Sequence, residues 1–463
     1  MQIATVPLAQ SPLSAGYQHL EASEFAQVCQ AYEGLWRQEG KFPLIVFPVP
    51  GPLRFLIPPM HICTDWSVGK TLLQEGTVDE HDPRSLQMLA PRGTANRGMQ
   101  FVMAAFGGAL GKLLLRHGAA YQYPHLAELT NDYLSFVMPA GPKHARLRET
   151  YAYPADAARL KTLGYERLLG EGASAYLDGL RVRHAATFDT DIAPTIGRGT
   201  VIAAMAHLFG LSPALLDTLL ELSRAIDNVL AVRAAHQMLK EADDALGQAC
   251  ALLEQAALSG ELAPDGVLSQ EYARLVGPGG YTSRQWSFVG LMLLRVSMEN
   301  QIDALNLVVR RFAGLSDAEQ QALREAGGDQ FVRETLRCEP PVGFVLRWLP
   351  KAYAFDTPVP GKKLLLPKGS FVLFVPRLLQ SPLLSGNCGT YLLTFGYGPD
   401  RVCPGMNLGV GTIAVCAREI MCRCSFTYPT QQTLSENPFF RRILSAPGKV
   451  TILDRVVRVS TTL

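Results

Sequence analysis

The chain has 463 residues, of which 48% are hydrophobic and 18% are charged. That balance allows a large buried core and excludes disordered, collagen-like and acidic low-complexity proteins. Lysine and arginine total 43 against 41 aspartate and glutamate residues, and a net charge of +2 predicts neither a nucleic-acid partner nor an acidic tail. The nine cysteines are an odd number scattered along the chain, which does not favour a disulfide framework.

The first residues show no targeting pattern, because a basic start, a continuous apolar stretch and a cleavage site are all missing. A membrane-spanning helix needs about 20 apolar residues, and the nearest candidate, 101–115, is interrupted by three glycines and a lysine. We therefore expect a cytoplasmic protein without a membrane anchor.

Taken in chain order, the sequence predicts strands first and then a long helical body. Residues 43–58 alternate apolar runs with Pro-Gly-Pro, which favours a hairpin of two short strands. Between about 140 and 340, apolar residues recur at helical spacing in 144–160, 165–185, 192–209, 213–231, 234–258, 283–313, 317–326 and 328–338. The expected N-caps are Asp191, Ser212 and Ser316, and the expected C-caps are Gly210 and Gly314.

After this helical body, residues 343–375 become β-like, 376–402 are rich in loops, and 404–424 return to a helix. The length alone suggests about three domains, but no shift in composition marks a boundary. We predict a mainly α chain with a minor β portion, folded as a single large domain over residues 1–463.

The most specific local pattern is the glycine-rich stretch from Phe395 to Gly405, which brings Cys403 to the start of the helix at 404–424. Backbone N–H groups at a helix start donate to sulfur, and the positive helix end lowers the pKa of a thiol. Pro404 suits the first helical turn, and a glycine lets a flat ligand approach the backbone. The thiolate is a candidate nucleophile or axial iron ligand; a buried structural cysteine is the alternative.

Two distant groups of charged residues accompany this cysteine. Glu334 and Arg337 lie three residues apart on one helix, which favours an ion pair. His144 and Arg148 lie one helical turn apart, and Arg347 follows a Pro-Pro-Val sequence by five residues. A histidine and two arginines are suited to binding a pair of carboxylates.

In order and spacing, these residues resemble the cytochrome P-450 family. The resemblance implies the cytochrome P-450 fold, with 43–75 as its N-terminal sheet and helix, 140–340 as its helical body, 343–375 as a strand-rich part, 395–405 as the haem-thiolate loop and 404–424 as the proximal helix.

The resemblance further implies a haem b that is bound without a covalent bond, with the Cys403 thiolate as the metal ligand. The cofactor-binding residues that it implies are His144, Arg148, Arg347, Phe395, Arg401, Cys403 and Gly405. Glu334 and Arg337 then correspond to the family's structural ion pair on the proximal side.

Two departures from the family pattern lie close to the cysteine. The loop is one residue longer than usual, because Phe395 and Gly398 lie eight and five positions before Cys403. This insertion is expected to alter the surface where an electron donor docks. The segment before Phe395 is short and lacks the usual arginine-bearing stretch, so Arg377 is the candidate partner for the structural ion pair.

A third departure concerns the long helix expected over the iron. Where the family carries Ala-Gly-x-(Asp/Glu)-Thr, residues 296–300 read Val-Ser-Met-Glu-Asn. Glu299 and Asn300 are the candidate catalytic residues for handling protons and water, although an amide cannot relay a proton as a hydroxyl does. The bulk of Val296 narrows the space above the iron, and Arg295 has no assigned role.

These features predict a haem-thiolate monooxygenase that oxidises a small to medium organic substrate in specialised metabolite biosynthesis. Electrons are expected from a separate ferredoxin or flavodoxin type partner. Asn300 and the altered loop leave open a peroxide-using enzyme or an oxygen-independent isomerase or dehydratase. A non-catalytic haem-binding or partner-recruiting protein is the third interpretation, since a fold does not fix a function.

Overall fold

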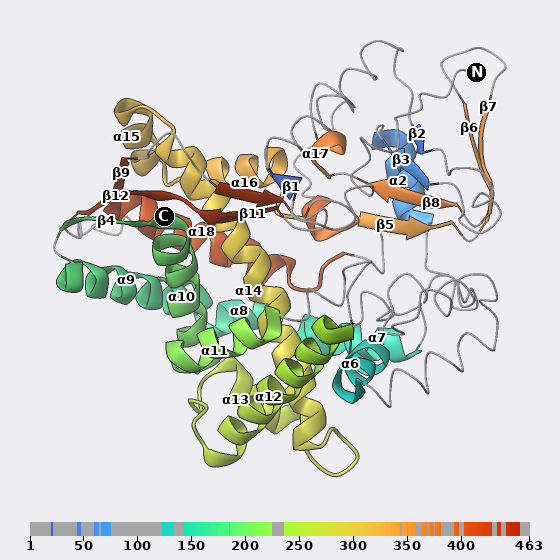
Figure 1. Cartoon of the computed structure of the whole chain (residues 1–463), viewed down its shortest axis with the longest axis horizontal. Coiled ribbons are helices and arrows are strands. Elements are labelled where there is room, and N and C mark those ends of the chain that lie inside the picture. The colour runs from blue at the N-terminus through green and yellow to red at the C-terminus, as the bar shows by residue number, and fades with distance from the viewer. Residues whose placement is uncertain are drawn as a thin grey trace.

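The computed structural model describes residues 20–21, 44–47, 60–63, 66–75, 123–133, 142–184, 186–224, 236–342, 345–349, 351–356, 363–368, 370–374, 376–380, 393–397, 402–427, 433–436 and 441–453. These residues form a mainly helical body with several small sheets (Figure 1). The longest helix, α14 (Ser283–Ala313), runs through the middle of the molecule, and its Trp286, Phe288 and Phe312 are among the largest fully buried side chains.

The described residues form thirteen further α-helices. They are α2 (Trp66–Glu75), α6 (Pro124–Glu128), α7 (Pro142–Ala152), α8 (Ala157–Leu163), α9 (Tyr165–His184), α10 (Gly199–Phe209), α11 (Pro213–Arg224), α12 (His236–Ser259), α13 (Val267–Leu275), α15 (Asp317–Ala326), α16 (Asp329–Cys338), α17 (Pro376–Leu379) and α18 (Met406–Arg423). Short π-helical or 3-10 turns are η3 (Leu129–Tyr133), η5 (Tyr153–Ala155), η6 (Ala193–Arg198) and η8 (Leu393–Phe395).

The strands form four small sheets. They are β1 (Leu20–Glu21), β2 (Leu44–Phe47), β3 (Met60–Cys63), β4 (Thr187–Asp191), β5 (Val345–Trp348), β6 (Tyr353–Asp356), β7 (Lys363–Leu366), β8 (Phe371–Phe374), β9 (Cys424–Thr427), β10 (Thr433–Glu436), β11 (Arg441–Ser445) and β12 (Pro447–Ile452). The sheet orders are β2-β3-β8-β5, β4-β12-β9, β1-β10-β11 and β6-β7, and β3 pairs in parallel with β8. The four-stranded sheet lies with α2 on the side of the molecule away from α9 and α10 (Figure 1).

The expected fold class, mainly α with a minor β portion, is confirmed, and several predicted helices have the predicted bounds. Helices α14 and α15 occupy 283–313 and 317–326 as expected. Ser316 caps α15 by accepting a hydrogen bond from the Glu319 N–H at 3.4 Å, and Ser212 accepts one from the Leu215 N–H at 3.2 Å. Gly210 ends α10 in the left-handed conformation with φ +75°, which favours glycine.

Other predictions in the helical body were wrong in detail. The helix expected over 144–160 is broken at η5, where Pro154 cannot donate a backbone hydrogen bond. Asp191 is not an N-cap; it ends β4, and its carboxylate accepts a hydrogen bond from the Ala446 N–H at 2.7 Å. Gly314 is the C-cap of α14, as predicted, in the right-handed region with φ −81°. Helix α13 was not predicted.

The strand predictions succeed locally and miss the distant pairings. The expected hairpin at 43–58 has its first strand at β2, but the partner strand is β3, which begins at Met60. The stretch 343–375 contains β5 to β8, as expected. Strands β9 to β12 were not predicted; β12 pairs with β4, which is more than 250 residues earlier in the chain.

Two further absences apply to the described residues. No disulfide is formed among the described cysteines. No single described helix meets the length and hydropathy required to cross a membrane, while the bent pair Ala193–Phe209 and Pro213–Arg224 does so only when taken together.

Glycine controls the close packing of α9 against α10. A β-carbon at Gly172 would lie 2.6 Å from the Ala203 carbonyl oxygen and 2.9 Å from the Ala204 Cα, both of which are backbone atoms that cannot rotate away. On the same helix, a β-carbon at Gly179 would have only an arginine side-chain nitrogen near it, at 3.9 Å.

We predict opposite effects for these two glycines. Gly172→Ala should lower the free energy of unfolding by about 1–3 kcal/mol, because the two helices must separate. Gly179→Ala should raise it by about 0.5–1 kcal/mol, because alanine favours the helix. Urea denaturation measures both, and equal stability of the two variants would contradict the described helix contact.

Candidate functional site

The loop before α18 holds Cys403 in a fixed position. The Cys403 N–H donates to the Phe395 carbonyl at 2.6 Å, and the Cys403 carbonyl accepts from the Met406 N–H at 3.2 Å. Gly396 adopts a left-handed φ of +78°, which turns the chain directly after Phe395. The sulfur is therefore presented at the N-terminal end of α18, as the sequence predicted.

The environment of the Cys403 thiol contains opposing influences on its pKa. Burial raises the pKa, while a backbone hydrogen bond from Gly405 and the charge of Arg148 lower it. The net direction is upward, so the expected lowering by the helix end is outweighed by desolvation. In the absence of a cation at the sulfur, the thiol is therefore favoured over the thiolate.

Helix α7 supplies the positive charge beside this sulfur. Both His144 and Arg148 lie on α7, one turn apart, with His144 buried and Arg148 half-buried. Of the other predicted cofactor contacts, Arg347 lies in β5 opposite Val372, and its side chain is outside the described residues. Arg401 also lies outside the described residues.

Helix α14 meets α18 close to the cysteine loop. A β-carbon at Gly409 on α18 would lie 3.1 Å from the Phe395 ring and 3.8 Å from Gln301 Nε2 on α14. The absence of a side chain at Gly409 thus allows the loop, α18 and α14 to pack together. Asn300 directly precedes Gln301, so the candidate catalytic region of α14 lies beside this contact.

One face of α14 remains accessible in the middle of an otherwise buried helix. It consists of Val296, which is 40% exposed, and the half-buried Ser297 and Asn300. Asn300 lies four residues after Val296 and three residues after Ser297, so the three side chains lie on the same side of the helix. We call them the accessible face. Within the described residues the Asn300 amide makes no hydrogen bond, so it can bind water or a ligand there.

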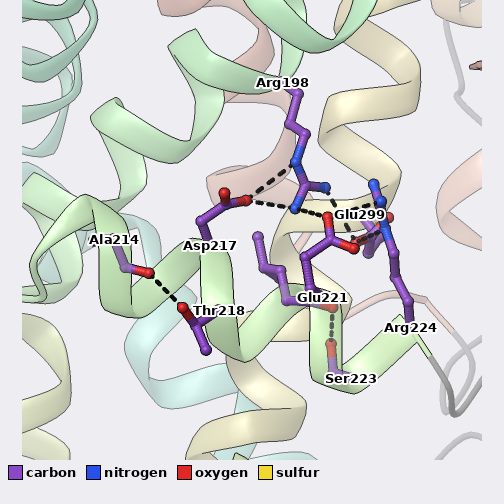
Figure 2. A network of polar contacts seen from close by, with 9 residues as sticks. Arg198, Ala214, Asp217, Thr218, Glu221, Ser223, Arg224 and Glu299 are labelled. Carbon is purple, nitrogen blue, oxygen red and sulfur yellow. Dashed lines mark hydrogen bonds and ion pairs between the residues drawn. The ribbon is translucent and has the colours of Figure 1, made fainter.

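The other predicted catalytic residue, Glu299, points away from this face. The residue is 5% exposed, and its carboxylate accepts a hydrogen bond from Arg224 Nε at 3.2 Å, with Arg198 Nη1 at 3.8 Å (Figure 2). Arg224 ends α11, and Arg198 precedes α10. The structure therefore does not bring Glu299 and Asn300 together. The two arginines are distant in sequence, and no local pattern indicated them.

Two residues next to this region have structural contacts. Arg295 is buried and donates from Nε to the Ser223 carbonyl at 3.1 Å, at the end of α11. Ser297, at the family's glycine position, donates its hydroxyl to the Leu294 carbonyl at 3.1 Å on its own helix. Such back-bonding locally weakens or bends a helix.

The expected ion pair on α16 is present. Arg337 Nε donates to Glu334 Oε2 at 2.9 Å, and Arg337 Nη1 donates to the carbonyl of Gln380. The acceptor that joins the pair to the chain after α17 is therefore a backbone carbonyl. The side chain of Arg377, the proposed partner, lies outside the described residues.

This pair predicts a defined pH dependence of stability. The hydrogen bond from Arg337 holds the pKa of Glu334 below its ordinary value of 4.5. A lowered folded-state pKa gives stability that is complete above about pH 4.5 and disappears as the pH falls through the lowered value. Glu334→Gln should therefore destabilise the protein above that pH and lose its effect below it.

Urea denaturation at a series of pH values measures this difference, with Arg337→Gln as the matched background. In that background the pH-dependent effect of Glu334→Gln should be much smaller, because the largest cause of the lowered pKa is gone. A pH-dependent effect of unchanged size without Arg337 would contradict the assigned cause.

Among the comparisons with known proteins, matches are found to solved structures alone. No protein-family model matches the sequence, and no curated protein does either. The solved structure of CYP108D1 from Novosphingobium aromaticivorans superposes with a TM-score of 0.65 at 15% identity, covering 97% of this chain and 100% of that chain. The myxobacterial cytochrome P-450 CYP267B1 gives a TM-score of 0.63 at 16% identity, covering 97% of this chain and 100% of that chain.

A third structure, P450BioI in complex with an acyl carrier protein, gives a TM-score of 0.65 at 15% identity over 93% of this chain and 99% of that chain. The matched residues span nearly the whole of each chain. This likeness over nearly the full length shows that the chain has the cytochrome P-450 fold.

Proposed function

We propose that the chain is a haem-thiolate monooxygenase that holds haem b through Cys403. The observation that carries the proposal is the position of Cys403 at the start of α18, where the charge of Arg148 on α7 acts on its sulfur, within a cytochrome P-450 fold. A haem bound there supplies oxidising chemistry, because thiolate donation favours O–O cleavage.

The residues around Cys403 fit a haem thiolate. Iron would replace the thiol proton and so offset the cost of burying the sulfur. The Gly405 N–H already donates to the sulfur, and a β-carbon at that glycine would lie 3.8 Å from it. Phe395 packs at the contact between the loop and α18, where its ring would lie 3.1 Å from a β-carbon at Gly409.

The propionates of the haem would be held by His144, Arg148 and Arg347, with Arg401 as a further contact. His144 and Arg148 lie one turn apart on α7, and the Arg148 charge reaches Cys403. A histidine and guanidinium groups match the hydrogen-bonding geometry of carboxylates. Glu334 and Arg337 would maintain the fold on the proximal side, through the Gln380 carbonyl.

On the other side of the haem, the accessible face of α14 would hold water and substrate. The Asn300 amide orients water there through a hydrogen bond, and Val296 presents an apolar surface to the substrate. Glu299 supplies protons to that water when its carboxylate leaves Arg198 of η6 and Arg224 of α11.

The substrate would be a small to medium organic molecule, in the biosynthesis of a specialised metabolite. The neighbouring structures hold such compounds, among them myristic acid and erythromycin B. Electrons would come from a separate ferredoxin or flavodoxin type protein in the cytoplasm.

The second candidate is a peroxide-using enzyme or an oxygen-independent isomerase or dehydratase. It is favoured by Asn300, which replaces the hydroxyl residue, and by Glu299, whose carboxylate is bound to arginines on the far side. Turnover of substrate with reductant and oxygen supports the monooxygenase. Turnover only with peroxide, or without any oxidant, supports this second candidate.

Replacement of the axial sulfur is the direct test of the cofactor assignment. Cys403→Ser should fold, because the loop is held by backbone hydrogen bonds, but should lose the thiolate signature of the ferrous carbonyl spectrum. Cys422→Ser, at the other end of α18, is the matched control and should keep it. Retention of the signature in Cys403→Ser would show that another residue binds the iron.

A second substitution tests the role of Asn300. Asn300→Thr introduces the hydroxyl that the family's usual pattern carries at this face, and this should change the fraction of reductant electrons that appear in product. The measurement is the ratio of product formed to reductant consumed. An unchanged ratio and rate would contradict a role for Asn300 in ordering water.

A further inference from the structure

The segment formed by α6 and η3 depends on neighbouring helices for its structure. Helix α6 (Pro124–Glu128) has only five residues, and the π-helical turn η3 (Leu129–Tyr133) follows it directly. An isolated helix shorter than about 12–15 residues is marginal in water, and a π-helical turn rarely forms outside a longer helix. Contacts with α7, α12 and α14 therefore hold residues Pro124–Tyr133 in place, and we call them the docked segment.

Helix α12 holds the first half of the docked segment (Figure 1). The Leu126 N–H donates to Oδ1 of the buried Asp243 at 2.7 Å. One turn further along α12, a β-carbon at Gly247 would lie 2.5 Å from Cδ2 and 2.6 Å from Nε2 of His125. The imidazole therefore occupies the space that a side chain at Gly247 would need. On its other edge, Nδ1 of His125 lies 3.0 Å from Nη2 of Arg284 on α14.

Helices α14 and α7 hold the second half. The Tyr133 ring stacks on Phe288 of α14, with ring centroids 5.1 Å apart and planes inclined by 4°. The hydroxyl of Tyr151 on α7 donates to the Tyr133 carbonyl at 2.8 Å. Burial raises the pKa of Tyr151, so the phenol keeps its proton and remains a donor. Loss of this donor would leave a buried carbonyl without it, which is costly.

The side of α7 that carries Tyr151 also carries the predicted cofactor contacts. Arg148 lies four residues after His144 and three residues before Tyr151, so the three side chains lie along one side of the helix. His144 and Tyr151 are both buried there. A ligand that fixes α7 through His144 and Arg148 therefore also fixes the donor to η3.

We propose that Tyr151 couples the cofactor site on α7 to the docked segment, so that occupation of His144 and Arg148 by the haem propionates tightens the docking of α6 and η3. The proposal rests on the proposed haem-thiolate function. Coupling between two sites is reciprocal in binding free energy. A change that loosens the docked segment on α12 must then weaken haem binding, although α12 supplies none of the predicted haem contacts.

The first test is the equilibrium partition of haem between the full-length chain and apomyoglobin. Gly247→Ala places a β-carbon against the His125 ring and loosens the docked segment, so haem affinity should fall about five-fold or more. In a Tyr151→Phe background the same substitution should change the affinity by less than about two-fold, because the link is missing.

Two further variants complete this test. Asp243→Ala removes the acceptor of the Leu126 N–H and should lower haem affinity as Gly247→Ala does. Gly179→Ala, on α9, is the matched control, because its β-carbon would meet only an arginine side-chain nitrogen at 3.9 Å. Its haem affinity should equal that of wild type.

The second test is hydrogen exchange of residues Pro124–Tyr133 in the haem-loaded chain, with α9 as the internal reference. Gly247→Ala, Asp243→Ala and Tyr151→Phe should each speed exchange in the docked segment and leave α9 unchanged. Tyr176→Phe is the matched control for the phenol, because Tyr176 also donates to a backbone carbonyl, that of Thr195 at 2.7 Å. It should not change exchange in the docked segment.

Two results would overturn the proposal. In the first, Gly247→Ala and Asp243→Ala speed exchange in the docked segment but leave haem affinity unchanged, or lower it equally with and without Tyr151. In the second, neither variant speeds exchange, which would contradict the docking contacts themselves.

The outcomes also separate this proposal from the proposed function. If wild-type protein shows no thiolate signature, the haem-thiolate function fails. If the signature is present and haem affinity does not respond to the docked segment through Tyr151, the coupling alone fails.

Discussion

The attachment of one cysteine to the start of one helix is the constraint on which the site depends. The Cys403 N–H is tied to the Phe395 carbonyl at 2.6 Å, and Gly409 lets α18 pack against the Phe395 ring and α14. Burial raises the pKa of the thiol, which opposes a free thiolate in this position. A metal cation bound to the sulfur would remove that penalty, so the same burial that disfavours the thiolate favours its coordination.

Helix α14 presents different side chains on its two sides. Its accessible face carries Asn300, whose amide is available to water, while Glu299 is turned toward Arg198 of η6 and Arg224 of α11. The two candidate catalytic residues are therefore neighbours in the sequence that do not face the same space.

The features that the sequence predicts correctly are those that depend on residues close together in the chain. The bounds of α14, the capping of α15 by Ser316 and the pair formed by Glu334 and Arg337 all arise within a few positions, and each was predicted correctly. The arginines of Glu299 lie 75 or more residues away, and the pairing of β12 with β4 spans more than 250. No periodicity or cap signals contacts of that kind, and the net effect of burial on the Cys403 pKa is equally non-local.

The most direct measurement is X-ray absorption at the iron edge on the purified full-length chain. If Cys403 binds the iron of a haem, the spectrum contains one sulfur neighbour in addition to the porphyrin nitrogens, and the sulfur contribution disappears in Cys403→Ser. Iron surrounded by nitrogen and oxygen alone in the wild-type protein, or a sulfur neighbour that persists in the variant, would contradict the assignment of Cys403 as the iron ligand.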